Sequence, residues 1–154
     1  MSPTIRAPYA TAICLSALSL LATAVATVPA AAHGTKTKTL EIVHPWCFDR
    51  FDNETRDVVV GMTIRNVGPR DEALVSARMP SGEKVEVVAV SAGSSAAAIA
   101  IPRGGSIDLH KAAAHLRIVG LKRSLVNHAT FPLTLVFKHA GAIKVDVMVE
   151  ETVK

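Results

Sequence analysis

Two histidines and a carboxylate lie close together in the second half of the chain. Asp108, His110 and His115 fall within eight residues, and neutral imidazole is a common ligand of copper and zinc. Three alanines, at 112 to 114, stand between the histidines, so the segment is compact enough for both imidazoles to converge. The spacing makes His110 and His115 candidate metal ligands.

Signatures of enzymes are missing from the sequence. It contains no H-E-x-x-H, no C-x-x-C and no G-x-S-x-G, which are local patterns of metalloproteases, thiol oxidoreductases and serine hydrolases. A blue-copper electron-transfer site needs a cysteine and a histidine on one loop near the carboxyl end, and no cysteine follows Cys47. We therefore expect no enzymatic activity and no catalytic residue.

The amino terminus has the features of an export signal. Arg6 precedes an apolar run from Ala10 to Val28, which ends in Ala30-Ala31-Ala32. A basic start, an apolar stretch interrupted by serines and threonines, and an A-x-A ending are typical of a cleaved secretory signal peptide. We expect residues 1–32 to be removed, which leaves His33 first and no membrane anchor on the mature protein.

Cleavage at this point would create a further candidate metal ligand. A free amino group and the Nδ1 atom of His33 together can chelate one Cu(II), which favours tetragonal nitrogen and oxygen ligands. Such a site needs a third donor, and His44 or His110 could supply it if the fold brings either close. The sequence leaves this open.

Charge and cysteine content exclude several classes of protein. Without Arg6 the chain keeps 16 of its 17 Lys and Arg against 13 Asp and Glu, a net charge of +3. The basic residues are scattered rather than clustered, so we expect no nucleic-acid partner. Cys14 leaves with the signal, and Cys47 then has no partner for a disulfide within the chain. A reactive thiol or a metal ligand is one role for Cys47, but we expect a small buried apolar residue beside Trp46 and Phe48.

The rest of the chain carries strand patterns and turn residues. The polar residues 33–39 are expected to be a mobile arm, and residues 40–154 a single β domain. In 57–66 four apolar residues, Val58, Val60, Met62 and Ile64, share one face, which is typical of a half-buried strand. Further strands are expected at 40–47, 73–79, 84–90, 98–101, 106–109, 115–119, 132–138 and 142–149.

Three of these expectations concern how strands begin, pair or end. Pro45 should confine the first strand to a sheet edge or end it early. Residues 80–83, with sequence PSGE, have the composition of a hairpin connection between their flanking strands. The last two strands should pair across the turn at 139–141. Short strands at about ten-residue spacing, without helical periodicity, predict an all-β, antiparallel Greek-key sandwich or barrel.

Several segments together resemble one protein family. They are the Trp46 strand, GMTIRNVG at 61–68, DEALVSA at 71–77, Ile101-Pro102, His115 before GLK at 120–122, and FPLTLVF at 131–137. In this order they are similar to the PCu(A)C family of periplasmic copper chaperones. The resemblance implies a cupredoxin-like β-barrel that binds copper and delivers it to a cytochrome oxidase subunit or another periplasmic assembly factor.

The ligand pattern of that family is incomplete in this chain. The resemblance implies a His at position 88, a Met at position 90, a Met in the following loop and a His-x-Met pair at 115–117. The chain has Val88, Val90, a loop at 91–98 without methionine, His115 and Arg117. Residues two apart in a strand share a face, so Arg117 would place a permanent positive charge beside the ion.

Two functions remain in competition. The first is a periplasmic copper-binding, chaperone-like protein whose metal site is degraded or relocated, with His115, His110 and His33 as candidate ligands. The second is a metal-free periplasmic β-barrel protein that serves protein–protein contacts.

Overall fold

The computed structural model describes residues 34–51, 54–91, 94–95, 98–110 and 114–152, and every regular element in them is a strand. The strands are β1 (Gly34–Lys36), β2 (Leu40–Phe48), β3 (Val58–Asn66), β4 (Glu72–Arg78), β5 (Lys84–Ser91), β6 (Ser94–Ser95), β7 (Ile99–Ile101), β8 (Ser106–Asp108), β9 (Ala114–Val119), β10 (Thr130–Phe137) and β11 (Gly141–Glu150). No helix in the described ranges is long and apolar enough to cross a membrane.

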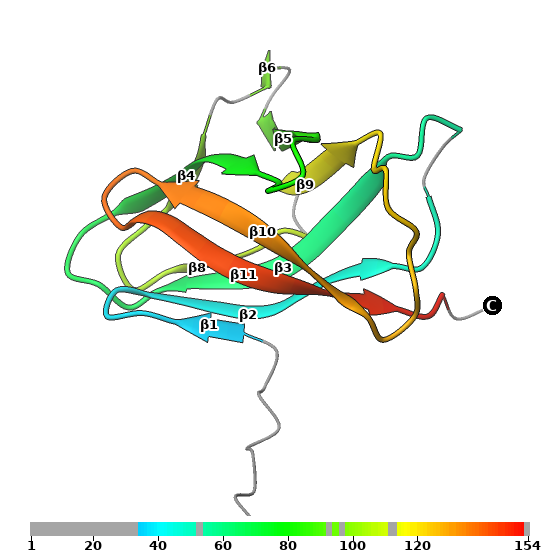
Figure 1. The fold of residues 1–154 in the computed structure, drawn as a ribbon. Coiled ribbons are helices and arrows are strands. Elements are labelled where there is room, and N and C mark those ends of the chain that lie inside the picture. Colours follow the sequence, from blue (N-terminus) through cyan, green and yellow to red (C-terminus); the bar gives the residue numbers. More distant parts are fainter. Residues whose placement is uncertain (1–33, 52–53, 92–93, 96–97, 111–113, 153–154) are drawn as a thin grey trace, which may run out of the picture.

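The strands form one curved sheet that nearly closes into a barrel (Figure 1). Its order is β6-β5-β9-β3-β2-β11-β10-β4-β7, with β1 added to β2 and β8 added to β3. All pairs are antiparallel except β11 with β2, which run parallel over three residue pairs. The predicted all-β barrel is therefore confirmed.

The long strand β3 holds two partners on the same side. β8 pairs with it at Thr63–Arg65, and β9 pairs with it at Val58–Val60. Directly after β8 the chain stays beside the middle of β3, where the Leu109 amide donates to the Met62 carbonyl at 2.9 Å. This arrangement brings both candidate histidines of the second half of the chain to one side of the barrel.

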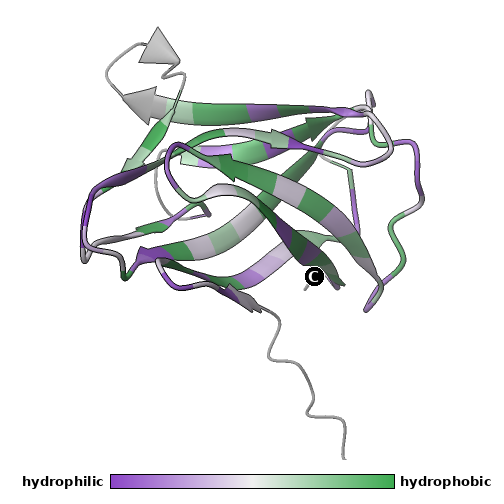
Figure 2. Ribbon diagram, turned by 60° about the vertical axis from the view of Figure 1, so that its left-hand side comes forward, coloured by the Kyte–Doolittle hydropathy of each residue, from purple (hydrophilic) through white to green (hydrophobic). Residues whose placement is uncertain are grey.

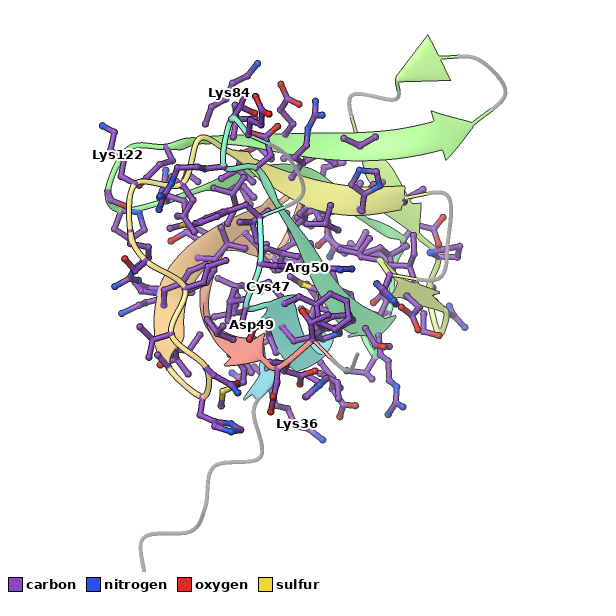
Figure 3. The ribbon with its side chains drawn as sticks, turned by 90° about the vertical axis from the view of Figure 1, so that its right-hand side faces the viewer. Lys36, Cys47, Asp49, Arg50, Lys84 and Lys122 are labelled. Carbon is purple, nitrogen blue, oxygen red and sulfur yellow. The ribbon has the colours of Figure 1, made fainter. Side chains whose placement is uncertain are left out.

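Alternating side chains build the core. Along β9 and β10 every second residue is buried, and Figure 2 shows apolar and polar bands alternating along the long strands. Cys47 has no exposed surface, as its predicted apolar role requires, and Met62 is only 1% exposed. Cys47 lies inside the ring of strands in Figure 3, whereas Lys36, Lys84 and Lys122 point outward.

The predicted hairpin between β4 and β5 is wrong. β4 pairs with β10 and β7, whereas β5 pairs with β9 and β6. The PSGE segment at 80–83 instead connects β4, near one end of the strand order, to β5, near the other end. A turn-like composition makes the chain reverse, but it does not specify that the two flanking strands become hydrogen-bonded neighbours.

Two expectations about the first strand are also wrong. Strands begin before Leu40, because Gly34–Lys36 pairs with Glu41–Val43 as β1. Pro45 neither ends β2 nor confines it to an edge, since β2 lies between β3 and β11. A β-bulge between Val43 and Trp46 absorbs the proline, with His44 in the left-handed region at a φ of 50°.

Candidate metal centre

His115, one of the candidate metal ligands predicted from the sequence, lies on the outer face of β5 and β9. Val88 pairs directly with His115, and Glu86 pairs directly with Arg117. Ala114 and Leu116 point into the core, so the intervening His115 lies on the outer face and is half-buried. Directly paired residues have Cβ atoms about 5 Å apart, which is close enough for two side chains to share an ion.

Arg117 is held in an ion-pair network rather than left free beside His115. Its Nε donates to Glu86 Oε2 at 3.0 Å, and Lys84 Nζ donates to Glu86 Oε1 at 2.8 Å. Arg117 also lies 4.0 Å from Asp57 Oδ2. The hydrogen bonds from Lys84 and then Arg117 hold the pKa of Glu86 below its ordinary value, and Glu86 raises the pKa of Arg117.

This network changes the expected electrostatics of the β5–β9 face, defined by Glu86, Val88, His115 and Arg117. The sequence predicts a permanent positive charge beside the ion. The structure places Arg117 on that face but offsets its charge with the Glu86 carboxylate.

The donor set of the β5–β9 face does not fit a four-ligand Cu(I) centre. His115 offers one imidazole, whereas Val88 offers only hydrocarbon. The Val90 side chain and residues 92–93, 96–97 and 111–113 lie outside the described part of the chain. Among the described residues, no group of three or more His, Cys, Asp and Glu side chains is placed to hold a metal ion.

His110 lies beside Trp46 instead. Its ring packs edge-on against the indole, with centroids 4.6 Å apart and planes at 61°. The indole itself covers Gly61 of β3, where an added Cβ would come within 2.8 Å of Trp46 Cε2. The bulge at His44 and Pro45 sets this register, since Trp46 pairs with Gly61 immediately after it.

A pocket of about 250 Å³ opens next to the indole. We call it the Trp46 pocket, and its lining residues are His44, Trp46, Met62, Thr63, Asp108 and His110. The fold thus brings His44 and His110 to one cavity, an arrangement that the sequence left open. His33, the third candidate, lies outside the described residues.

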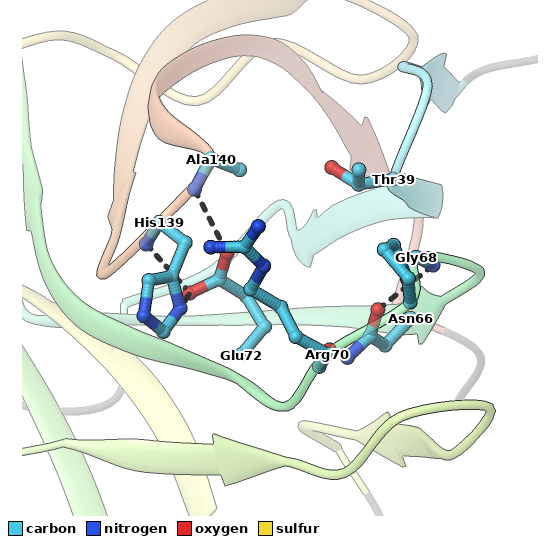
Figure 4. A pocket seen from close by; sticks show the side chains of 8 residues that line it. Thr39, Asn66, Gly68, Arg70, Glu72, His139 and Ala140 are labelled. Carbon is cyan, nitrogen blue, oxygen red and sulfur yellow. Dashed lines mark hydrogen bonds and ion pairs between the residues drawn. The ribbon is translucent and has the colours of Figure 1, made fainter.

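A separate buried carboxylate has a structural role. Glu72 accepts hydrogen bonds from the backbone amides of Ala73, His139 and Ala140 at 2.8 to 2.9 Å, and Figure 4 shows it reaching the β10–β11 turn. Burial alone would raise its pKa, but these amides hold the pKa below the ordinary value. Glu72 ties β4 to that turn.

Comparison with known proteins bears on the fold and the family. The model of the LpqE-like lipoprotein family matches residues 40–149. No curated protein sequence matches the chain.

Several solved structures share the fold. A copper-bound PCuAC domain from PmoF2 superposes with a TM-score of 0.67 at 22% identity, over 78% of this chain and 99% of that domain. The apo PCuAC domain from PmoF1 gives 0.69 at 22% identity, over 78% and 100%. Cu(I)-DR1885 from Deinococcus radiodurans gives 0.61 at 19% identity, over 81% and 85%. These likenesses establish the fold that the sequence resemblance predicted.

Proposed function

The chain belongs to the LpqE-like family, and on that premise we propose that it is an exported copper-handling protein of the chaperone type. The observation that carries the proposal is the accessible imidazole of His115 on β9, directly opposite Val88 of β5. Those are two of the positions at which the sequence resemblance implies copper ligands. The barrel has the fold of copper-binding domains, and the half-buried imidazole of His115 lies at one of these positions.

Copper is the cargo in this proposal, and the protein is a carrier rather than an enzyme. A carrier must bind its ion and then release it, which favours a small, solvent-accessible donor set over a closed cage. The half-buried imidazole of His115 is accessible in this sense. We propose a cytochrome oxidase subunit or another periplasmic assembly factor as the recipient, as the resemblance implies.

Export is part of the proposal. The segment 1–32 has the composition of a cleaved signal peptide, and the family description as lipoproteins also fits an exported protein. A cleaved signal peptide and a lipoprotein signal leave different amino termini. A lipoprotein keeps a lipid anchor, whereas a chain cut after Ala32 does not. The intact mass of the protein purified from the cell envelope distinguishes a free chain starting at His33 from a lipid-modified one.

A metal-free protein of the same fold is the competing function. It is favoured by Val88, which replaces a donor by hydrocarbon, and by the Arg117–Glu86 ion pair on the same face. Such a barrel would serve protein–protein contacts in the envelope.

Titration with copper under a competing chelator separates the two functions. The tag-free protein from the envelope is titrated with Cu(I) under reducing conditions and with Cu(II) in air. The copper-handling function predicts uptake of about one equivalent in at least one of the two titrations. Failure to take up either ion would support the metal-free function.

A further inference from the structure

The Trp46 pocket gathers metal-binding side chains from distant parts of the sequence. His44 comes from the bulge in β2, and Asp108 and His110 come from the end of β8 and the residues after it. The side chain of His44 is 52% exposed, and His110 is exposed as well. Two imidazoles and one carboxylate thus line one solvent-accessible cavity.

His44 already has the kind of partner that orients a metal-binding histidine. Its Nε2 lies 2.7 Å from Oε1 of Glu150, at the end of β11. When Nε2 donates its proton to a carboxylate, the Nδ1 lone pair becomes the available donor. Histidines that bind metals usually have such a carboxylate or carbonyl on the other ring nitrogen, which fixes the tautomer and the ring orientation.

His110 is positioned by two contacts of its own. Its backbone amide donates to Oδ1 of Asp108 at 3.0 Å, which keeps the two residues in one tight turn. Its ring is packed against the Trp46 indole. The imidazole is therefore held beside the pocket by packing rather than left free on a loop.

We propose that the Trp46 pocket is a copper(II) site in which His44 and His110 are the principal ligands and Asp108 supplies an oxygen. The donor chemistry selects the ion. Imidazole nitrogen and carboxylate oxygen in an open arrangement suit Cu(II), which also binds such sites more tightly than the other divalent first-row metals. Met62 lines the pocket but belongs to the core, so no thioether is available to favour Cu(I).

Metal binding at this site requires a local rearrangement. In the described residues no three His, Cys, Asp or Glu side chains already form a metal cluster, so the His44 imidazole must turn toward an ion held beside His110. The exposure of His44 permits this turn. The site rests on the proposed copper-handling function, but it lies in a different place from the β5–β9 face and uses different residues.

The single tryptophan of the chain reports on the site. Cu(II) bound to His110 would lie next to the indole and quench its fluorescence. Tag-free protein from the envelope is titrated with Cu(II) under a competing chelator, while Trp46 fluorescence and the Cu(II) electron paramagnetic resonance spectrum are recorded. We expect quenching to saturate near one equivalent, with nitrogen hyperfine structure from two imidazoles.

Variants assign the ligands. His44→Ala and His110→Ala should each weaken Cu(II) binding at least tenfold, and Glu150→Gln should weaken it about ten- to hundredfold. One control should leave the affinity unchanged: Asp146→Asn, an exposed carboxylate on the same strand as Glu150. Circular dichroism confirms that each variant is folded.

The possible results separate this inference from the proposed function. Cu(II) binding that survives both His44→Ala and His110→Ala, or that leaves Trp46 fluorescence unchanged, would overturn the Trp46 site while the copper-handling function stands. If the wild type takes up neither Cu(I) nor Cu(II), both proposals fail. Loss of Cu(II) binding in the His44 and His110 variants, with the Asp146→Asn control unaffected, supports the site.

Discussion

Val88 and His115 face each other across β5 and β9 as a directly paired couple on the outer surface of the barrel. One member can bind a metal ion, and the other cannot. The same two strands hold Glu86 and Arg117 as the next pair on that face, joined by an ion pair. The two strands thus pair positions at which the family resemblance implies ligands, and these positions carry one imidazole, one hydrocarbon side chain and an ion pair.

Adding donors to this face should strengthen Cu(I) binding. The triple variant Val88→His, Val90→Met, Arg117→Met would place two imidazoles and two thioethers on neighbouring positions, and soft thioethers suit Cu(I). We expect Cu(I) affinity to rise at least tenfold in a chelator competition assay. Val126→His adds a histidine at an exposed position elsewhere and should have no effect. An unchanged affinity in a folded triple variant would show that these positions are not the ligand positions.

Glu86 and Arg117 should have opposite effects on any metal held by His115. Glu86→Gln removes the carboxylate that offsets Arg117, so an uncompensated guanidinium would then repel the ion. Arg117→Ala removes the positive charge and leaves Glu86 beside the site. The test uses Val88→His as its background, because this variant has two histidines facing each other. Adding Glu86→Gln to this background should weaken Cu(I) binding, and adding Arg117→Ala should strengthen it. Equal effects of the two changes would contradict the ion-pair account.

Gly61 is needed because the Trp46 indole lies directly on it. Gly61→Ala would place a methyl group 2.8 Å from the nearest indole carbon, and overpacking of this kind typically costs about 1–3 kcal/mol. We expect a lower midpoint of denaturation and a shifted Trp46 emission maximum. Thr63→Ala, on the same face of β3, should leave the emission maximum where it is. An unshifted spectrum in Gly61→Ala would argue against the indole position.

Glu72 should make the stability of the barrel dependent on pH. Its buried carboxylate accepts hydrogen bonds from three backbone amides, and charge-assisted bonds of this kind contribute about 1.5–3 kcal/mol each. Because its pKa in the folded state is lowered, this contribution is fully present above the unfolded-state pKa of about 4.3. It is lost as the pH falls through the lower, folded-state pKa.

The variant Glu72→Gln tests this dependence by urea denaturation. The variant should be less stable than the wild type at pH 7, and the difference should shrink as the pH falls below about 4. Asp71→Asn, the exposed neighbouring carboxylate, serves as the matched control. A difference that stays constant from pH 7 to pH 3 would show that the charge of Glu72 is not what stabilises the turn.

The sequence predicts the last hairpin in detail because its information is local. Leu133, Leu135 and Phe137 alternate with polar or half-buried residues, and a short turn follows. The structure pairs Leu133 with Val145 and Leu135 with Ile143, so the predicted β10–β11 pairing is confirmed. Strand alternation and a tight turn together set the register, since a one-residue slip would expose the whole apolar face.

Other features depend on contacts between distant segments. The residues at 80–83 specify a reversal but not the strand that β5 joins, and β5 finds its partner in β9. Pro45 is tolerated within β2 because a bulge with His44 at a positive φ removes it from the regular ladder. The convergence of His44, His110 and Glu150 also requires three strands to be in place. The local signal of that pocket was the closeness of Asp108 and His110 in the sequence, and only the fold adds His44 to them.

The most direct test of the central claim is the copper content of the native protein under buffered metal. The tag-free protein from the envelope is dialysed to equilibrium against chelator-buffered Cu(I) and, separately, Cu(II), and bound copper is measured per chain. The account predicts about one retained equivalent in at least one oxidation state. Protein that is folded by circular dichroism and retains no copper in either buffer would contradict it.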